Sequence, residues 1–150
     1  MARFYDLERA NARVPELREI LESLRSQLAE LTRLRDAVLE RQSAVEAATE
    51  SGAPGPARSA DEDDDDGPDD ELRLIRLRMQ GLIDQMQAGV ARIDALGITL
   101  RDIPTGLIDF PALASGRQIW LCWRLGEEDV EWWHEANTGF SDRRPLLDLT

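Results

Sequence analysis

The chain has 150 residues, the length of one ordinary domain, and a formal net charge of −12. Its 30 acidic residues outnumber 18 basic residues, all of which are arginine. Residues 50–71 hold ten of the acids and a single arginine, so the remainder of the chain is nearly neutral. A nearly neutral folded part argues against a nucleic-acid-binding protein, which would carry a basic face.

The number of cysteines and the length of the apolar runs indicate where in the cell the protein is expected. Cys122 is the single cysteine, which excludes an internal disulfide and fits a reducing cytosol. The apolar run Ile119–Trp123 has five residues, whereas a membrane span needs about twenty. Charges appear at Asp6, Glu8 and Arg9, a pattern unlike that of a signal peptide. We therefore expect a cytoplasmic protein with no membrane partner.

Two helical segments are expected within residues 1–49. Asp6 can cap a short helix over residues 7–13, and Pro15 favours a new start because proline is tolerated in a first turn. From there to residue 48, spacings of three and four alternate, which predicts one long helix with a coiled-coil-like seam. The seam consists of Leu17, Leu21, Leu24, Leu28, Leu31, Arg35, Val38, Gln42 and Val45. Its two polar members are expected at an edge, with their heads in solvent.

Residues 50–69 are expected to form a disordered acidic loop. They consist largely of glycine, proline, alanine, serine and a run of acids at 61–66, so little apolar surface offsets the chain entropy. The acidic run lacks the spaced ligands and the distal glutamate of a calcium-binding loop. We therefore expect no metal at this loop and no cofactor in the protein.

The same spacing resumes in residues 70–97, which predicts a second helix that ends at Gly97. The repeating positions are Ile75, Met79, Leu82, Met86, Gly89, Ile93 and Leu96. Two such helices joined by a loop are expected to fold back as an antiparallel hairpin. If the two helices meet at the loop, Leu24 lies near Leu96, and the helix end that carries Leu17 extends beyond the second helix.

Residues 98–150 are expected to form a small antiparallel sheet, packed with the hairpin as one domain of the α+β class. The expected strands cover residues 98–103, 107–110, 118–125 and 130–134. A two- or four-residue loop puts odd positions of the third strand beside even positions of the fourth. The resulting core face holds Ile119, Leu121, Trp123, Leu125, Val130, Trp132 and His134, and it is expected to cover Leu17, Ile20 and Leu21.

Candidate binding residues come from polar and aromatic positions at the two ends of the chain. His134 is the sole histidine, and on this pairing it faces away from Cys122, which disfavours a Cys–His site. No phosphate-binding loop, nucleophile elbow or zinc-protease motif is present. The expected ligand- or partner-binding set is Glu8, Asn11, Asp109, Arg117, Trp120, Glu127, Trp133, His134 and Arg144. These residues are expected to gather where the sheet meets the opening helix.

The last third of the chain carries an ordered series of short motifs. They are Gly106–Pro111, Gly116-Arg117, Leu121-Cys122-Trp123, Gly126-Glu127, Trp133-His134, Gly139-Phe140 and Arg144-Pro145. With the opening residues 6–11 and 15–17, this series resembles the uncharacterised family called domain of unknown function 2203. The resemblance spans nearly the whole chain apart from the acidic loop. It implies the architecture and no activity, cofactor or catalytic residue.

The sequence leaves two classes of function open. The first is a small protein-interaction or scaffold protein that presents its helical hairpin and Trp-bearing sheet to a protein partner or to a second copy of the chain. The heptad seams and the lack of a catalytic motif favour it. The alternative is a small-ligand-binding protein or an enzyme with a polar site around Asp109, Arg117, Glu127 and His134, which requires these groups to converge.

Overall fold

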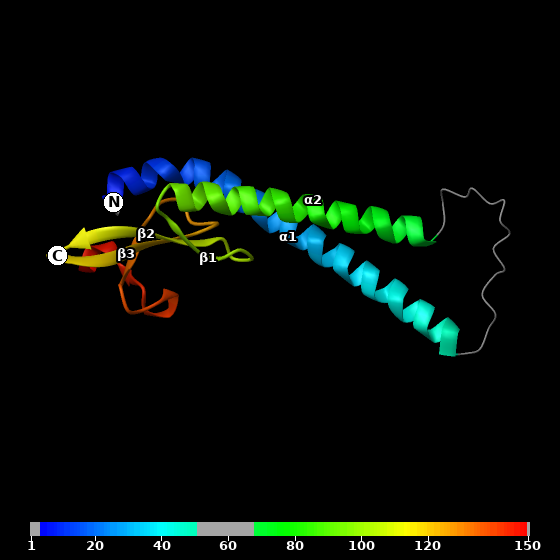
Figure 1. Ribbon diagram of the computed structural model, residues 1–150. Helices are drawn as coiled ribbons and strands as arrows, with labels where there is room; N and C mark the ends of the chain where they lie inside the picture. The colour runs from blue at the N-terminus through cyan, green and yellow to red at the C-terminus, as the bar shows by residue number, and fades with distance from the viewer. Residues whose placement is uncertain (1–3, 51–67, 150) are drawn as a thin grey trace. The chain divides into compact units, whose positions relative to one another are not determined.

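The computed structural model describes residues 4–50 and 68–149, in which two helices precede a five-stranded antiparallel sheet (Figure 1). Helix α1 is Leu7–Glu50 and helix α2 is Pro68–Ala95. The strands, in sheet order, are β1 (Thr99–Asp102), β2 (Leu107–Ala114), β3 (Arg117–Arg124), β4 (Trp132–Glu135) and β5 (Arg144–Pro145). Short 3₁₀ helices, η1 (Phe140–Asp142) and η2 (Leu146–Asp148), flank β5. The expected α+β class with a C-terminal sheet is confirmed, whereas the expected acidic loop falls almost wholly outside the described residues.

The chain divides into two compact units. Unit 1 comprises Met1–Leu28 and Gln85–Thr150, and unit 2 comprises Ala29–Asp84. Each unit pairs a segment of α1 with a segment of α2, and the pairs that show this are Glu16–Arg92, Gln27–Gln85, Glu30–Arg78 and Arg41–Glu71. In these pairs, a higher residue number in α1 goes with a lower one in α2, so the helices are antiparallel within each unit, as expected. Among the described residues, no helix is both long enough and apolar enough to cross a membrane.

Helix α1 is continuous through Pro15, so the expected separate short helix is the beginning of α1. Asp6 caps it as expected, because its Oδ1 accepts the backbone N–H of Arg9 at 2.7 Å. Pro15 itself is exposed, but Val14 and Leu17 beside it are buried in the core that also takes in the sheet. Burial of apolar side chains on both sides of Pro15 offsets the lost backbone hydrogen bond, which costs about 3 kcal/mol in a helix interior.

The helical seams follow the expected positions closely in α2 and in the first half of α1. Every expected position of α2, from Ile75 to Leu96, is buried or half-buried. In α1 the apolar seam positions are buried or half-buried as far as Val38, and Arg35 and Gln42 are exposed, as predicted. Val45, which was expected in the seam, is 60 % exposed.

The expected register between the helices is wrong by one heptad. Leu24 lies against Gly89 rather than Leu96, with its Cδ2 3.1 Å from the point that a Cβ of residue 89 would occupy. Successive heptads pack alike, so their spacing does not choose between registers seven residues apart. In the observed register, the missing side chain of Gly89 leaves room for Leu24.

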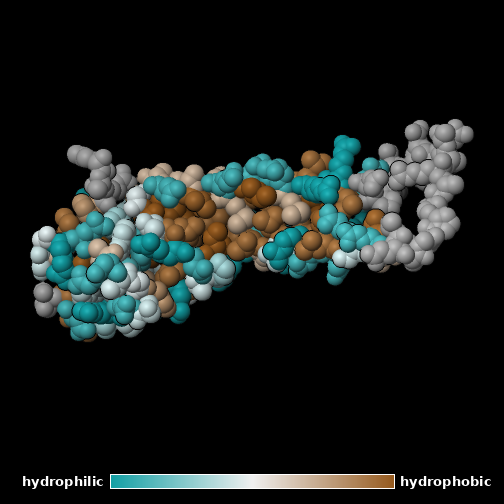
Figure 2. Space-filling model, turned by 60° about the horizontal axis from the view of Figure 1, so that its bottom comes forward, coloured by the Kyte–Doolittle hydropathy of each residue, from teal (hydrophilic) through white to brown (hydrophobic). Residues whose placement is uncertain are grey.

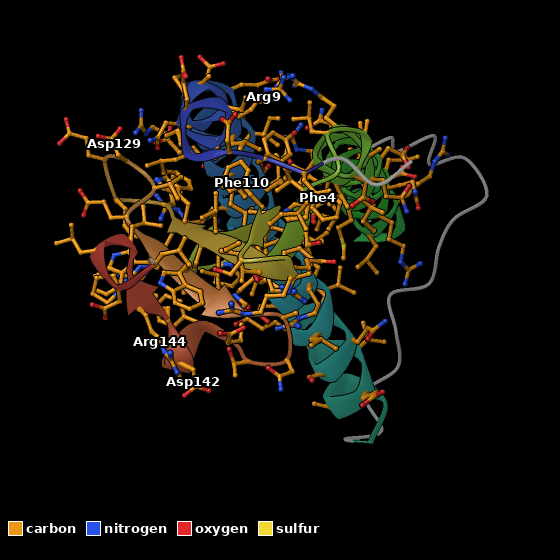
Figure 3. The ribbon with its side chains drawn as sticks, turned by 90° about the vertical axis from the view of Figure 1, so that its left-hand side faces the viewer. Phe4, Arg9, Phe110, Asp129, Asp142 and Arg144 are labelled. Carbon is orange, nitrogen blue, oxygen red and sulfur yellow. The ribbon has the colours of Figure 1, made fainter. Side chains whose placement is uncertain are left out.

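The sheet has an inner face that packs against the helices of unit 1. Strand pairing puts Ile108 opposite Trp123 and Phe110 opposite Leu121, and Leu121 is in turn opposite Trp133. These side chains join one hydrophobic cluster with residues of both helices, and Figure 3 shows Phe110 between the sheet and the helices. The members from the helices are Ala10, Val14, Leu17, Ile20, Leu21, Leu24 and Ile93. The expected packing of Leu121 and Trp123 over Leu17 is therefore confirmed.

The connection from β3 to β4 overturns the expected assignment of faces in the second hairpin. Cys122 is opposite Trp132 and Trp120 is opposite His134, so even positions pair with even positions. The tryptophan of β4 that lies in the core is consequently Trp133, which is 2 % exposed, and not Trp132. His134 and Trp132 lie on the outer face of the sheet together with Cys122, contrary to expectation.

The cause is a connection longer than a tight turn. The backbone N–H of Arg124 donates to the Glu127 carboxylate at 2.8 Å, and Gly126 adopts a φ of 106°, so the chain bulges before β4 begins. Val130, expected in the strand, instead donates its N–H to the Asn11 side chain of α1 at 2.7 Å. Because side chains alternate along a strand, one residue more in the connection than expected moves each side chain of the next strand to the opposite face of the sheet.

The segment that precedes α1 extends the sheet contacts. Strand β1 pairs with β2 only as far as Asp109, and the N–H of Tyr5 donates to the carbonyl of Pro111 farther along β2 at 2.7 Å. The Tyr5 hydroxyl donates to the carbonyl of Leu96 at 2.5 Å, and its ring meets Phe110 edge-on with centroids 5.3 Å apart. Tyr5 thereby links the sheet to the end of α2.

Two glycines in turns of the sheet give a matched stability test. Gly106 and Gly116 both have positive φ, 67° and 77°, but a Cβ on Gly106 would lie 2.5 Å from the Cβ of Leu125, whereas Gly116 has open space. We expect Gly116→Ala to lower the free energy of unfolding by about 1–2 kcal/mol and Gly106→Ala by about 2–4 kcal/mol, because only the latter adds a clash to the backbone strain. Urea denaturation measures both, and equal losses would contradict the close approach of Leu125.

Candidate functional site

A polar cluster lies on the outer face of the sheet and draws on three neighbouring strands. Asp109 of β2 is opposite Cys122 of β3, and His134 of β4 lies on the same face. The side chains of Asp109 and His134 are 3 % and 1 % exposed. Two ionisable groups are therefore enclosed on the sheet face that the helices do not cover.

The hydrogen bonds of this cluster converge on one carboxylate oxygen. Asp109 Oδ2 accepts the Nε–H of Arg101 at 2.8 Å and lies 3.0 Å from His134 Nε2. His134 Nδ1 lies 2.9 Å from the backbone oxygen of Glu135, which can only accept, so Nδ1 carries a proton. Asp109 Oδ1 and Trp120 Nε1 are buried and have no hydrogen-bond partner within the described ranges.

The Cys122 thiol beside this carboxylate is fully buried. Burial, and then the negative charge of Asp109, raises the pKa of Cys122 to about 12, against the opposing effect of Arg143. The thiol is therefore neutral at physiological pH. A neutral, enclosed thiol is a poor nucleophile and a poor metal ligand.

The chain after β4 closes the outer face. Arg143 donates to Glu127 at 3.0 Å, and its guanidinium lies 4.5 Å from the ring centroid of Trp132 and 4.3 Å from that of Phe140. Arg101 similarly lies 5.0 Å from the ring of Trp120. Figure 3 shows Asp142 and Arg144 of this segment on the side of the sheet away from Arg9 of α1. Both outer tryptophans are thus covered by arginines of the same chain.

The structure separates the predicted binding set into distinct places. Asp109, Trp120, Glu127 and His134 belong to the outer cluster. Arg117 and Arg144 lie instead over the ring of Trp133, at 5.9 and 5.6 Å. Asn11 holds the connection before β4 through Val130, and Glu8 is exposed in the first turn of α1. The nine residues do not share one cleft at the opening helix, because Asp109 and His134 are enclosed on the outer face, whereas Glu127 also lines a hollow with residues of α1.

The predicted binding set leaves out Arg101 and Arg143, which supply the cluster with positive charge. A usable signal was present in the position of Asp109, between Ile108 and Phe110 in a strand. A carboxylate buried in such a strand requires cationic partners from adjoining segments. The Cys122–His134 relation was missed for a different reason, which is the exchanged faces of β4.

Two surface hollows of unit 1 lie elsewhere. One, of about 510 Å³, is lined by Phe4, Tyr5, Arg9, Ala12 and Arg13. The other, of about 250 Å³, is lined by Arg18, Glu22, Arg25, Leu125, Gly126, Glu127 and Glu128. Neither includes Asp109 or His134 in its lining. Within residues 4–50 and 68–149, no three or more His, Cys, Asp or Glu side chains are grouped so that they could hold a metal ion.

The geometry of the outer cluster suits a structural link between strands better than a catalytic site. A general base must come within hydrogen-bond distance of a substrate proton, but both ring nitrogens of His134 are already engaged inside the protein. Asp109 instead connects Arg101 of β1 with His134 of β4 across the two strands between them.

Removing the charge of Asp109 tests this role. Asp109→Asn leaves Arg101 and His134 without their anion, and we expect a loss of about 3–5 kcal/mol in the free energy of unfolding. Glu135→Gln is the control, because Glu135 is ion-paired with Arg117 at the surface, where a pair contributes about 0–1 kcal/mol. Urea unfolding at neutral pH compares them. Equal losses of unfolding free energy in the two variants would show that Asp109 is not a structural link between the strands.

The buried thiol gives a pH-dependent prediction. A folded-state pKa of about 12, against an ordinary value of 9.0, means that Cys122 favours the folded state fully below pH 9 and loses this effect as the pH rises towards 12. At pH 8 we expect a thiol reagent to leave the native protein unmodified and to label it rapidly in urea. Rapid labelling without denaturant would contradict the enclosure of Cys122.

Comparisons with known proteins place the chain in a family. No curated protein and no solved structure matches it. A family model described as "Uncharacterized conserved protein (DUF2203)" matches residues 3–146, a range that includes both helices and strands β1 to β5. This match confirms the resemblance seen in the motifs of the last third. The chain therefore belongs to the DUF2203 family of uncharacterised conserved proteins.

Proposed function

We propose that this protein is a protein-interaction protein and that its partner binds the helices of unit 2. The observation that carries the proposal is the exposure of large apolar side chains there. Leu74 and Leu77 of α2 are 65 % and 59 % exposed. Leu82 is the one fully buried side chain among the described residues 29–47 and 70–84. Unit 2 thus buries little apolar surface within the chain, and such surface on a helix marks an interaction site.

Helix α2 carries two apolar seams within this unit. The inner seam, at Leu72, Ile75, Met79 and Leu82, is half-buried or buried. The second, which we call the outer stripe, consists of Leu74, Leu77 and Gly81, all exposed. Its spacings of three and four residues are those of a helix-pairing seam. The two seams are separated by roughly 150° around the helix, so a helix that covers one leaves the other uncovered.

Further apolar surface accompanies the helices. Leu39 of α1, also in unit 2, is 53 % exposed. Figure 2 shows one face of the molecule, on which hydrophobic residues extend along the helices between hydrophilic ones. A protein-binding helical surface typically has this mixture of an apolar centre and a charged border.

The Trp-bearing sheet, the other expected contact surface, is less suited to a partner. Its outer rings, Trp120 and Trp132, lie under the guanidinium groups of Arg101 and Arg143. Its inner rings, Trp123 and Trp133, are buried in the core. The alternative of a small-ligand site around Asp109 and His134 has less support, because both side chains are enclosed and neither surface hollow includes them.

Site-specific photo-cross-linking in cells tests the proposal. A photoreactive residue in place of Gln80, exposed beside the outer stripe, is expected to give a discrete cross-linked product. The same residue in place of Leu147, which is 91 % exposed in η2, is expected to give none. Leu74→Ser with Leu77→Ser should abolish the product while the circular dichroism of the helices is kept. A product that survives the two changes, or no product from position 80, refutes the interaction site.

A further inference from the structure

A glycine in the middle of α2 has no evident purpose within the chain. Gly81 has no heavy atom within 4 Å of the position where its Cβ would be, and it is not among the glycines with positive φ. Glycine in a helix interior is less favourable than alanine by about 1 kcal/mol. Such a residue is useful where another backbone approaches closely. Gly81 lies in the outer stripe, four residues after Leu77.

We propose that the partner of the outer stripe is a second copy of this chain, paired antiparallel through α2; this inference rests on the proposed function. A two-fold axis near residues 78 and 79 places Leu77 opposite Gly81 of the second copy, and the reverse contact follows by symmetry. Each leucine then fills the space that the absent glycine side chain leaves on the facing helix. The exposed Leu74 extends the same stripe by one turn.

The charges beside the stripe agree with this arrangement and select its direction. Arg73 and Asp84 are both exposed and flank the same side of the outer stripe. The two-fold axis that joins Leu77 to Gly81 brings Arg73 opposite Asp84 of the second copy, and this pair occurs twice. A parallel pairing would instead put Arg73 beside Arg73 and Asp84 beside Asp84. Like charges in register oppose pairing, so the sequence favours the antiparallel dimer.

The size of the contact determines its strength. From Arg73 to Asp84 the helix makes about three turns, which is a small patch for a protein interface. A contact of this size fits a reversible, concentration-dependent dimer better than an obligate one. The exposure of Leu74 and Leu77 in the single chain accords with a surface that is covered only part of the time.

Sedimentation of the full-length protein over a concentration series, from about 1 μM to about 1 mM, tests the proposal. The wild type is expected to be a monomer at the low end and a dimer at the high end. Leu77→Ser should raise the dimer dissociation constant by at least about tenfold. Leu147→Ser, which changes an equally apolar but distant exposed residue, should leave the constant unchanged.

Gly81→Ala separates an interface effect from an effect on the helix. Alanine is the better helix former, so within a monomer the change should hold or raise the stability of α2. In the proposed dimer the added methyl group occupies the space of Leu77, and the dissociation constant should rise by about tenfold or more. An unchanged constant, or one lowered together with a stabilised helix, overturns the pairing.

Charge reversal tests the direction. Arg73→Asp and Asp84→Arg should each weaken the dimer, and the double variant should restore it, because the two exchanged residues face each other again. Failure of the double variant to restore a dimer that both single variants weaken overturns the antiparallel register. A wild type that stays monomeric throughout also overturns this inference. If position 80 nevertheless cross-links to a different protein, the proposed function stands; if it cross-links to nothing, both fall.

Discussion

The Asp109 carboxylate is enclosed in the sheet, and much of unit 1 is arranged around that fact. Removing a carboxylate from water costs several kcal/mol unless cations and hydrogen-bond donors replace the solvent. Arg101 and His134 do so from strands on either side. An outer face with a charged centre cannot be covered by an apolar helix, and here it is covered by Phe140 and Arg143 of the chain after β4. The helices cover the apolar inner face, and the chain's own end covers the face that carries this carboxylate.

Much of the fold could be predicted because its patterns are local. The seam of α2 and the stop at Gly97 follow from spacing and from the conformational freedom of glycine, whose φ there is 76°. The continuity of α1 through Pro15 could not be predicted, because it depends on the sheet that buries Val14 and Leu17. The faces of β4 could not be assigned either. Both faces carry tryptophan, so the pattern of the strand did not indicate which ring is in the core.

The sequence predicted which residues form the candidate site better than it predicted how they contact each other. Asp109 and His134 were both singled out, and they do contact each other. Their partner Arg101 lies on β1, and the pairing of β1 with β2 contains a register shift between Leu100 and Asp102, next to Arg101. Such an irregularity leaves no simple trace in a sequence, so the direction of a side chain beside it cannot be read from alternation.

The two units show what the same kind of helix does with and without a sheet beside it. In unit 1 the seam of α1 has the sheet as well as α2 to pack on, and Leu17 and Leu21 are 0 % exposed. In unit 2 the helices have only each other among the described residues, joined at the surface by Glu30–Arg78 and Arg41–Glu71. Exposed ion pairs of this kind contribute little to stability. Several apolar side chains of the helices therefore stay exposed in unit 2, whereas Leu17 and Leu21 of unit 1 are buried against the sheet.

The bond between Asn11 and Val130 has a consequence for how the protein is made. It joins residues 119 positions apart, and the Arg18–Glu128 contact spans 110. At roughly 5–20 residues per second, α1 leaves the ribosome on the order of ten seconds before the strands that bury it. During that interval the apolar face of α1 has no sheet to pack on. Completion of the core thus waits until the strands have been synthesised, so its timing is set by the pace of synthesis rather than by the speed of helix formation.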